Sequence, residues 1–327
     1  MVSPAIELSG LTKYYGDVRG IEDLTLTVER GEVFGFLGPN GAGKSTAIRA
    51  LLGFLRPTSG EVTLLGKRVA DRHELVEVKH ELGHIPGDFA FYDSLSGRRH
   101  LDYYESLRGG ERRAELEALF PAPFDRKVGT YSRGNRQKLA IVQAFMHDPT
   151  LVVMDEPTSG LDPLVQRTFY EFLEAERERG VTVLFSSHIL SEVRRVCDRV
   201  AVIRNGRLVA VEDIDTLLRK SGKVVRATLT EHPPIETFDL PGVVRGEYES
   251  KGVLKLIVNG GYDELLDRLS SYTVEDIEIR EASLEDVFMH FYTDRDDGVT
   301  ENERSEGDTE RRERDGDDAL PAESTDA

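Results

Sequence analysis

The pattern G-x-x-x-x-G-K-[ST] is matched by Gly38-Pro39-Asn40-Gly41-Ala42-Gly43-Lys44-Ser45, and Thr46 follows. Residues 32–37 (EVFGFL) read as a buried strand and residues 44–55 as a helix, so the loop joins a strand to a helix. In such a loop the backbone N–H groups converge on one point, and the helix N-terminus adds its positive dipole end. We expect Lys44 to reach the terminal phosphates of a nucleotide and the Ser45 hydroxyl to ligate Mg²⁺. An incidental glycine-rich turn is the alternative, and the strand and helix on either side argue against it.

A second buried strand, residues 151–155 (LVVMD), places two carboxylates at its end. Ligands of open α/β sheets bind at the carboxyl ends of the strands. Because side chains alternate between the faces of a strand, Asp155 and Glu156 need not serve the same partner. We expect Asp155 to hold Mg²⁺, directly or through water, and Glu156 to polarise an attacking water. Such a pair alone is more often a solvated strand end, but the apolar run before it and Pro157 after it favour a site.

Short β-branched runs alternate with amphipathic stretches from Ile6 to about residue 220, which predicts an α/β fold on a largely parallel sheet. Residues 181–186 read as a third buried strand, and two alternating runs around Asn205-Gly206 predict a hairpin. Residues 88–149 are polar and helical, with a break at residues 121–123, and we expect them to form an inserted helical subdomain.

The pattern changes after residue 220. Strands are expected at residues 223–230, 253–259 and 274–280, and helices at residues 262–269 and 283–292. We therefore predict a small α/β domain over residues 221–293, compatible with a ferredoxin-like unit. The sequence shows neither an internal repeat nor a heptad run long enough for a coiled coil.

The chain is acidic, with 60 Asp and Glu against 42 Lys and Arg and a net charge of −18, which argues against a nucleic acid partner. Residues 294–327 hold half of that charge, −9, with almost no apolar side chains, and we expect a disordered acidic tail. Of the basic residues, 10 are lysines. An acidic, lysine-poor surface favours a salt-adapted, halophilic protein, with an ordinary acidic cytosolic protein as the alternative.

Two further observations concern the compartment. No run of about 18 or more apolar residues occurs, and the first residues lack the features of a signal peptide, which argues against a membrane span and against secretion. The single cysteine, Cys197, excludes an internal disulfide framework and a cysteine-rich metal site, and it favours an intracellular protein.

These motifs resemble the ATP-binding subunit of an ATP-binding cassette (ABC) transporter over about two-thirds of the chain. Tyr15 resembles the aromatic residue that stacks on adenine, and His188 the switch histidine. Residues 131–135 stand at the signature position, and Ser159-Gly160-Leu161-Asp162 resembles the D-loop. Taken singly, Tyr15 and His188 would read as a packed aromatic and a surface histidine. Their order around the phosphate loop favours the site.

The resemblance implies a P-loop NTPase of ABC type over residues 1–220, with its helical subdomain at about 88–149 and the small C-terminal α/β domain after it. It implies an ATPase that binds ATP and Mg²⁺. The catalytic residues would be Glu156 and His188. Besides the phosphate loop, Tyr15, Ser132, Gly134 and Asp162 would contact the nucleotide. The metal ligands would be Ser45, Asp155 and Asp88.

Two departures from the family pattern matter. The signature usually reads LSGGQ, but Arg133 replaces the first glycine and Asn135 the glutamine. Ser132 at a helix N-cap still offers a hydroxyl and backbone donors to a phosphate. Gly87 stands where the Q-loop glutamine is usual, which leaves Asp88 as the nearby candidate for metal or water contact. Both departures, together with the C-terminal run at residues 284–288 (LEDVF), resemble the cassettes of ABC-2 type exporters.

The resemblance further implies two cassettes arranged head to tail, each ATP lying between the phosphate loop of one and the Ser132 region of the other. Separate membrane (permease) subunits would dock between the sheet body and the helical subdomain, with the chain peripheral on the cytoplasmic face of the membrane. The small C-terminal domain would choose the partner or stabilise the dimer. The sequence does not identify the cargo, and export rather than import rests on analogy.

Two other functions remain open at this point. A soluble cassette ATPase of translation or chromosome maintenance usually carries two cassettes or long coiled coils and engages nucleic acid, whereas this chain has one cassette and is acidic. An unrelated P-loop kinase or GTPase would leave the Ser132 to Gly134 segment and His188 unexplained.

Overall fold

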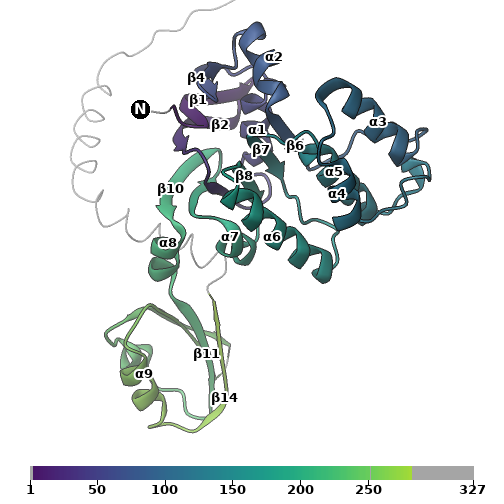
Figure 1. Ribbon diagram of the computed structural model, residues 1–327. Coiled ribbons are helices and arrows are strands. Elements are labelled where there is room, and N and C mark those ends of the chain that lie inside the picture. Colours follow the sequence, from purple (N-terminus) through teal and green to yellow (C-terminus); the bar gives the residue numbers. More distant parts are fainter. Residues whose placement is uncertain (1–2, 251, 282–327) are drawn as a thin grey trace, which may run out of the picture.

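A six-stranded sheet forms the centre of the N-terminal body in the computed structural model, which describes residues 3–250 and 252–281 (Figure 1). Its strand order is β10-β9-β3-β8-β7-β6. The strands are β3 (Val33–Leu37), β6 (Leu82–Ile85), β7 (Leu151–Asp155), β8 (Thr182–Ser187), β9 (Arg199–Arg204) and β10 (Arg207–Asp213). Every neighbouring pair is parallel except β9 and β10, so the predicted largely parallel sheet is confirmed. β3, β7 and β8 are buried along their whole length, as apolar runs of this length require.

The hairpin β9–β10 is also confirmed. Asn205 and Gly206 both have positive φ, 48° and 78°, as a two-residue type I′ turn demands.

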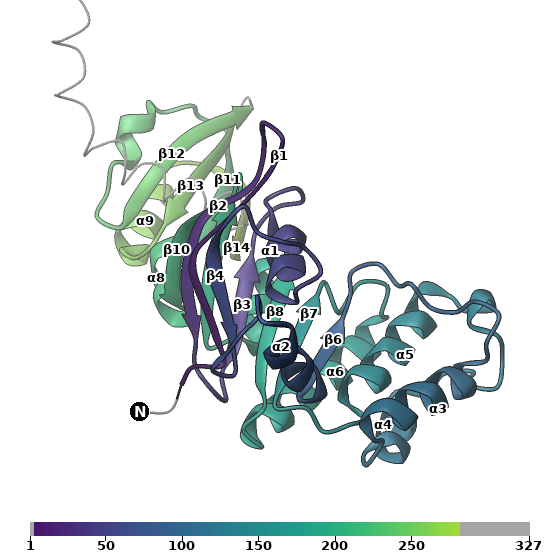
Figure 2. The same cartoon turned by 90° about the horizontal axis from the view of Figure 1, so that it is seen from above.

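A second sheet, which we did not predict, covers the first helix (Figure 2). It is antiparallel, in the order β2-β1-β4-β5, and consists of β1 (Ile6–Tyr15), β2 (Val18–Val28), β4 (Ser59–Leu64) and β5 (Lys67–Arg68). Helix α1 (Lys44–Leu51) packs Ala47, Ile48 and Leu51 into a core shared by both sheets. The helix ends four residues earlier than the predicted residue 55, because Gly53 takes φ +71°, a left-handed conformation that terminates helices.

Helices flank the central sheet. They are α2 (Arg72–His80), α3 (Gly97–Arg108), α4 (Arg113–Leu119), α5 (Arg133–Phe145), α6 (Pro163–Glu178), α7 (Leu190–Val196) and α8 (Ile214–Ser221), with a 3-10 turn η1 (Val128–Thr130). α5 begins at Arg133, because the Ser132 hydroxyl accepts a hydrogen bond from the Asn135 N–H at 3.3 Å and caps the helix there. Arg112, just before α4, pairs with the buried Glu176 of α6 at 2.6 Å.

The C-terminal part holds a four-stranded antiparallel sheet with a core of its own. In the order β12-β13-β11-β14, its strands are β12 (Val243–Ser250), β13 (Val253–Val258), β11 (Lys223–Leu229) and β14 (Val274–Glu281); η2 is Ile235–Phe238 and α9 is Tyr262–Leu269. This is the element order of a ferredoxin-like unit whose first helix is reduced to the turn η2. β12 was not predicted, and the helix expected at residues 283–292 lies outside the described residues.

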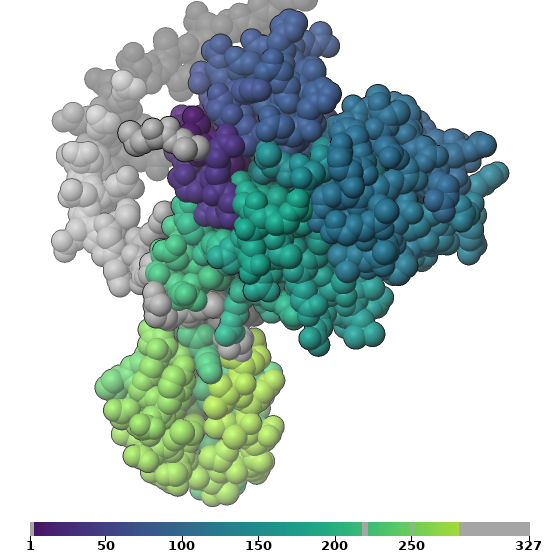
Figure 3. Space-filling view, in the orientation of Figure 1, coloured from purple at the N-terminus to yellow at the C-terminus, as the bar shows by residue number. Residues whose placement is uncertain are grey.

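Figure 3 shows the residues of this sheet as a lobe beside the N-terminal body. Val224 and Ile257 nevertheless belong to the core of that body, together with Leu217. The domain boundary at residues 220 and 221 therefore stays a prediction, as do the limits of the helical subdomain and of the tail.

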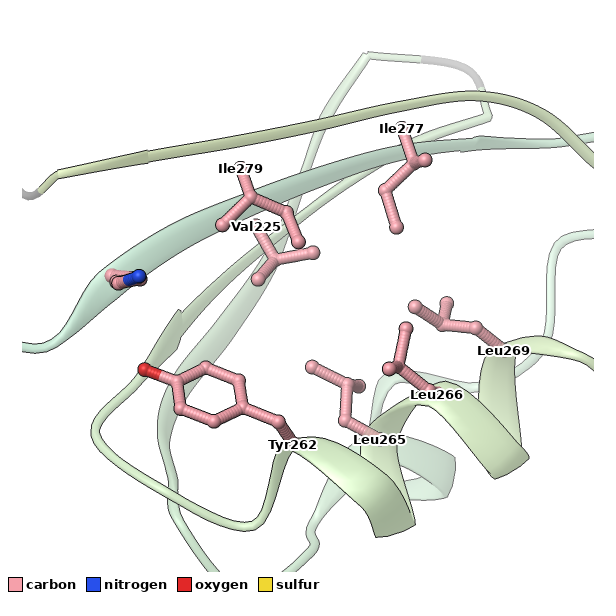
Figure 4. Close-up of a pocket in the computed structure, with 8 residues that line it drawn as sticks. Val225, Tyr262, Leu265, Leu266, Leu269, Ile277 and Ile279 are labelled. Atoms are coloured by element: carbon pink, nitrogen blue, oxygen red, sulfur yellow. The ribbon is translucent and has the colours of Figure 1, made fainter.

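An apolar groove of about 240 Å³ runs between α9 and β14 (Figure 4). It is lined by Lys223, Val225, Tyr262, Leu265, Leu266, Leu269, Ile277 and Ile279. Among the helices that the structure describes, none has the length and apolarity to cross a bilayer.

Candidate nucleotide site

The phosphate loop is held between β2 and the β9–β10 turn by close backbone approaches. Gly43 has φ +105°, and a Cβ there would lie 2.7 Å from the Gly20 carbonyl oxygen. A Cβ at Gly38 would collide with the Ile203 carbonyl oxygen. The Gly206 N–H also donates to the Ala42 carbonyl oxygen at 2.9 Å. The packing around the loop therefore requires glycine at positions 38 and 43, and the left-handed backbone at Gly43 requires it as well.

Lys44 folds back over this loop. Its Nζ donates to the carbonyl oxygens of Gly38 at 2.6 Å and Pro39 at 3.1 Å and lies 3.9 Å from Glu156 Oε1. The residue is 5% exposed, and burial lowers the pKa of its ammonium group, while the Glu156 and Asp155 carboxylates oppose that shift. A cation held this way among backbone oxygens and carboxylates is placed to receive phosphate oxygens. Thr46 lies half-buried in the first turn of α1.

Asp155 ends β7 with both carboxylate oxygens engaged by hydroxyl groups. Ser45 Oγ donates to Oδ2 and Ser186 Oγ to Oδ1, each at 2.7 Å. The predicted pair of Ser45 and Asp155 is thus brought together, and Asp88 lines the same pocket, of about 360 Å³. These oxygen donors suit Mg²⁺, which keeps several waters and takes one or two protein carboxylates. Within residues 3–250 and 252–281 no group of three or more His, Cys, Asp or Glu forms an all-protein metal cage.

Glu156 stands in a backbone conformation that non-glycine residues rarely adopt, with φ +49°. Its N–H donates to the Ser186 carbonyl oxygen at 3.1 Å, which ties it to the end of β8. The Glu156 carboxylate lies 2.9 Å from Nδ1 of His188, which follows β8 directly. The structure therefore brings together Lys44, the pair Asp155 and Glu156, and His188 from three separate segments.

Three other predicted residues make contacts within their own parts of the cassette. Tyr15 is 48% exposed at the β1–β2 turn, with Lys13 Nζ 5.4 Å from its ring centroid. Gly134 packs so closely on the D-loop that a Cβ would meet the Gly160 carbonyl oxygen at 2.7 Å. Asp162 caps α6 by accepting the Leu164 and Val165 N–H groups, both at 3.1 Å.

Comparisons with known proteins identify the family to which this chain belongs. The family model described as ABC transporter matches residues 21–159. The bacitracin transport ATP-binding protein BcrA of Bacillus licheniformis is 30% identical over 303 residues, covering 88% of this chain and 97% of BcrA. The chain belongs to the ABC transporter family of ATP-binding proteins.

Two more comparisons support the same family. YhcH, an uncharacterized ABC transporter ATP-binding protein of Bacillus subtilis, is 39% identical to this cassette over 219 residues, 64% of this chain and 70% of YhcH. A solved structure of an ATP binding subunit of an ABC transporter is 32% identical, with a TM-score of 0.59, and covers 66% of this chain and 92% of its own. The protein is thus an ABC ATPase with the α/β P-loop fold.

Ser186, Thr158, Ser187 and Glu192 were not predicted from the sequence. The Ser186 hydroxyl donates to Asp155, and the hydroxyl groups of Thr158 and Ser187 both donate to Glu192. Thr158 and Ser187 each lie within two residues of a predicted catalytic residue, which is the signal that could have pointed to them. Ser186 sits in a run that reads as ordinary buried strand.

Proposed function

We propose that this cassette is the ATPase of an ABC-2 type exporter, with Glu156 as the residue that polarises the attacking water. The observation that carries the proposal is the grouping of Glu156, His188 and Lys44, with Glu156 Oε1 2.9 Å from His188 Nδ1 and 3.9 Å from Lys44 Nζ. The assignment to ABC-2 type exporters rests on the departures in the signature and the Q-loop, which resemble that group. The proposal does not name the transported cargo.

The mechanism follows from the chain's own groups. The phosphate loop and the N-terminus of α1 direct backbone N–H groups at the phosphates, and Lys44 supplies a positive charge against the terminal one. Glu156 accepts a proton from the attacking water, and His188 fixes the orientation of that carboxylate. Ser45, Asp155 and Asp88 would hold Mg²⁺, which when bound neutralises charge on the phosphate oxygens.

A second cassette completes each site in this proposal. Ser132 is exposed at the N-cap of α5, so its hydroxyl and the first N–H groups of the helix are accessible to a γ-phosphate held by a partner. Arg133, exposed beside it, adds a cation where the common signature has glycine.

The membrane subunit is proposed to dock on an aromatic surface of the helical subdomain, which we define as Tyr92, Tyr103 and Leu107. They are 57%, 47% and 52% exposed, and the rings of Tyr92 and Tyr103 lie 6.4 Å apart. The chain runs from Gly87 and Asp88, which line the nucleotide pocket, directly to Tyr92. We therefore expect movement at the nucleotide pocket to reach this docking surface through residues 87–92.

A binding experiment tests this docking. We expect Tyr103→Asp combined with Leu107→Asp to abolish co-purification of the co-expressed membrane (permease) subunit, because a carboxylate disfavours an apolar contact. ATP hydrolysis by the isolated chain should not change. Val244→Asp, at a 40% exposed position on β12, is the matched control and should retain the partner. Undiminished recovery with the double variant would exclude this surface.

Salt dependence tests the halophilic interpretation. Residues 1–293 carry a net charge of −9, so two cassettes repel each other as they approach. The Debye length falls from ~10 Å at 0.1 M to ~3 Å at 1 M salt, while contacts inside a closed site are screened less. We therefore expect both the melting temperature and the ATPase rate to be higher in molar KCl than at 0.1 M. Sucrose of equal osmolality controls for solute exclusion, and a monotonic decline of both quantities over this range would contradict a salt-adapted protein.

A further inference from the structure

A buried carboxylate outside the predicted site connects the two segments that carry Glu156 and His188. Glu192, on α7, is 8% exposed. Thr158 Oγ1 donates to its Oε1 and Ser187 Oγ to its Oε2, each at 2.6 Å. Both donors are themselves buried, at 4% and 1% exposure. One side chain is therefore bonded on one oxygen to the segment after β7 and on the other to the end of β8.

The two hydroxyl groups lie next to the proposed chemistry. Thr158 comes two residues after Glu156, and Ser187 comes directly before His188. Ser187 Oγ also accepts the Ile189 N–H at 3.0 Å, so the backbone on both sides of His188 is fixed by one hydroxyl. Displacement of Glu192 would loosen both loops at once.

α6 places the Tyr170 phenol near the same carboxylate. Burial together with the negative charge of Glu192 raises the pKa of that phenol, so Tyr170 stays protonated. The Arg195 guanidinium lies 4.9 Å from the Tyr170 ring centroid and holds the ring from the outer side.

The backbone at Glu156 explains why such an anchor is needed. Its φ of +49° is unfavourable for a residue with a Cβ, and such conformations persist where the surroundings over-determine them. The Ser186 carbonyl oxygen fixes the Glu156 N–H, and the bond from Thr158 to Glu192 fixes the chain just beyond it. Without the second anchor, the turn is free to relax and to move the Glu156 carboxylate away from His188.

We propose that Glu192 is a positioning residue that sets the separation between Glu156 and His188. A buried carboxylate contributes little to stability compared with an apolar side chain of similar size, so stability alone does not account for it. A carboxylate offers two acceptor oxygens and no donor, which lets it orient two hydroxyl groups together. The inference rests on the proposed roles of Glu156 and His188.

Steady-state kinetics of purified variants test it. In Glu192→Gln, Thr158→Val and Ser187→Ala we expect kcat to fall by roughly ten- to a hundredfold, as for misplacement of a catalytic group. KM for MgATP should stay within about twofold, because Lys44 and Ser45 lie outside this network. Thr158→Ser keeps the hydroxyl and should restore kcat. Glu174→Gln removes an exposed carboxylate of α6 and is the matched control.

Coupling to Glu156 separates positioning from a merely structural role. Because residues that act as a unit are not additive, adding Glu192→Gln to Glu156→Gln should lower kcat no further. A purely structural role would instead lower the melting temperature of the single variants and leave kcat per folded molecule unchanged. Thr158→Val and Ser187→Ala provide the same test if Glu192→Gln does not fold.

These experiments distinguish a wrong role for Glu156 from a wrong positioning role for Glu192. If Glu156→Gln hydrolyses ATP at the wild-type rate, the proposed role of Glu156 is wrong. If Glu156→Gln is impaired while Glu192→Gln, Thr158→Val and Ser187→Ala all retain the wild-type kcat, the positioning role alone is wrong.

Discussion

Replacing Glu156 by glutamine is expected to lower steady-state ATP hydrolysis by about 10²- to 10⁴-fold, the usual effect of losing a general base. Glutamine has nearly the same shape and can keep a hydrogen bond to His188, but its amide does not accept the proton of the attacking water. Phosphate release by the purified variant measures the effect.

ATP binding by this variant should be retained, because Lys44 and the phosphate loop are unchanged. In the proposed head-to-tail arrangement, ATP that is bound and not hydrolysed holds two cassettes together. Size-exclusion chromatography with MgATP should therefore show the variant as a dimer. Glu174→Gln serves as the control and should behave as wild type. A wild-type hydrolysis rate in Glu156→Gln would show that another group polarises the water.

The substitution Lys44→Ala is expected to weaken MgATP binding by roughly ten- to a hundredfold, since a hydrogen bond to a charged group is worth about 1.5–3 kcal/mol. The ammonium is placed by the carbonyl oxygens of Gly38 and Pro39, and no second lysine lies near it in the sequence. Titration with a fluorescent ATP analogue measures the affinity.

Lys67→Ala is the matched control for Lys44→Ala. Lys67 lies on β5, and its ammonium group pairs with the Glu77 carboxylate at 2.8 Å on the surface. It should bind MgATP as the wild type does. A thermal melt of Lys44→Ala shows whether the loop is otherwise intact. An unchanged affinity in a folded Lys44→Ala protein would mean that residues 38–45 are not the phosphate site.

The part of the site that could be predicted from the sequence consists of residues that lie close together along the chain. The segment from β3 through the phosphate loop to α1 is continuous, and Asp155 and Glu156 directly follow an apolar run.

The antiparallel sheet β2-β1-β4-β5 was not predicted because bulges interrupt the alternation of apolar and polar residues along its strands. The β1–β2 register shifts three times between Leu8 and Tyr14, and Asp23 takes φ +52°. β12 is similarly irregular, with two register shifts against β13.

Contacts between distant segments could not be predicted in the same way. Ser186 lies 31 residues from Asp155, and Glu192 lies 34 residues from Thr158. Serine and threonine occur at many buried and exposed positions, so their type alone does not identify a partner. The short helix α7 gives little periodicity from which to infer that Glu192 points inward.

The edge position of β14 has a consequence for the handling of the protein in solution. In the part of the chain that the structure describes, β14 pairs with β11 on one side, and its Ile277 and Ile279 are 42% and 52% exposed. An open strand edge with apolar side chains invites pairing with a second molecule. Glu275, Asp276 and Glu278 interleave with these isoleucines, so like charges would face each other in a self-paired ribbon. We therefore expect these carboxylates to protect the protein against aggregation, and exchanging them for neutral side chains to create an aggregation-prone edge.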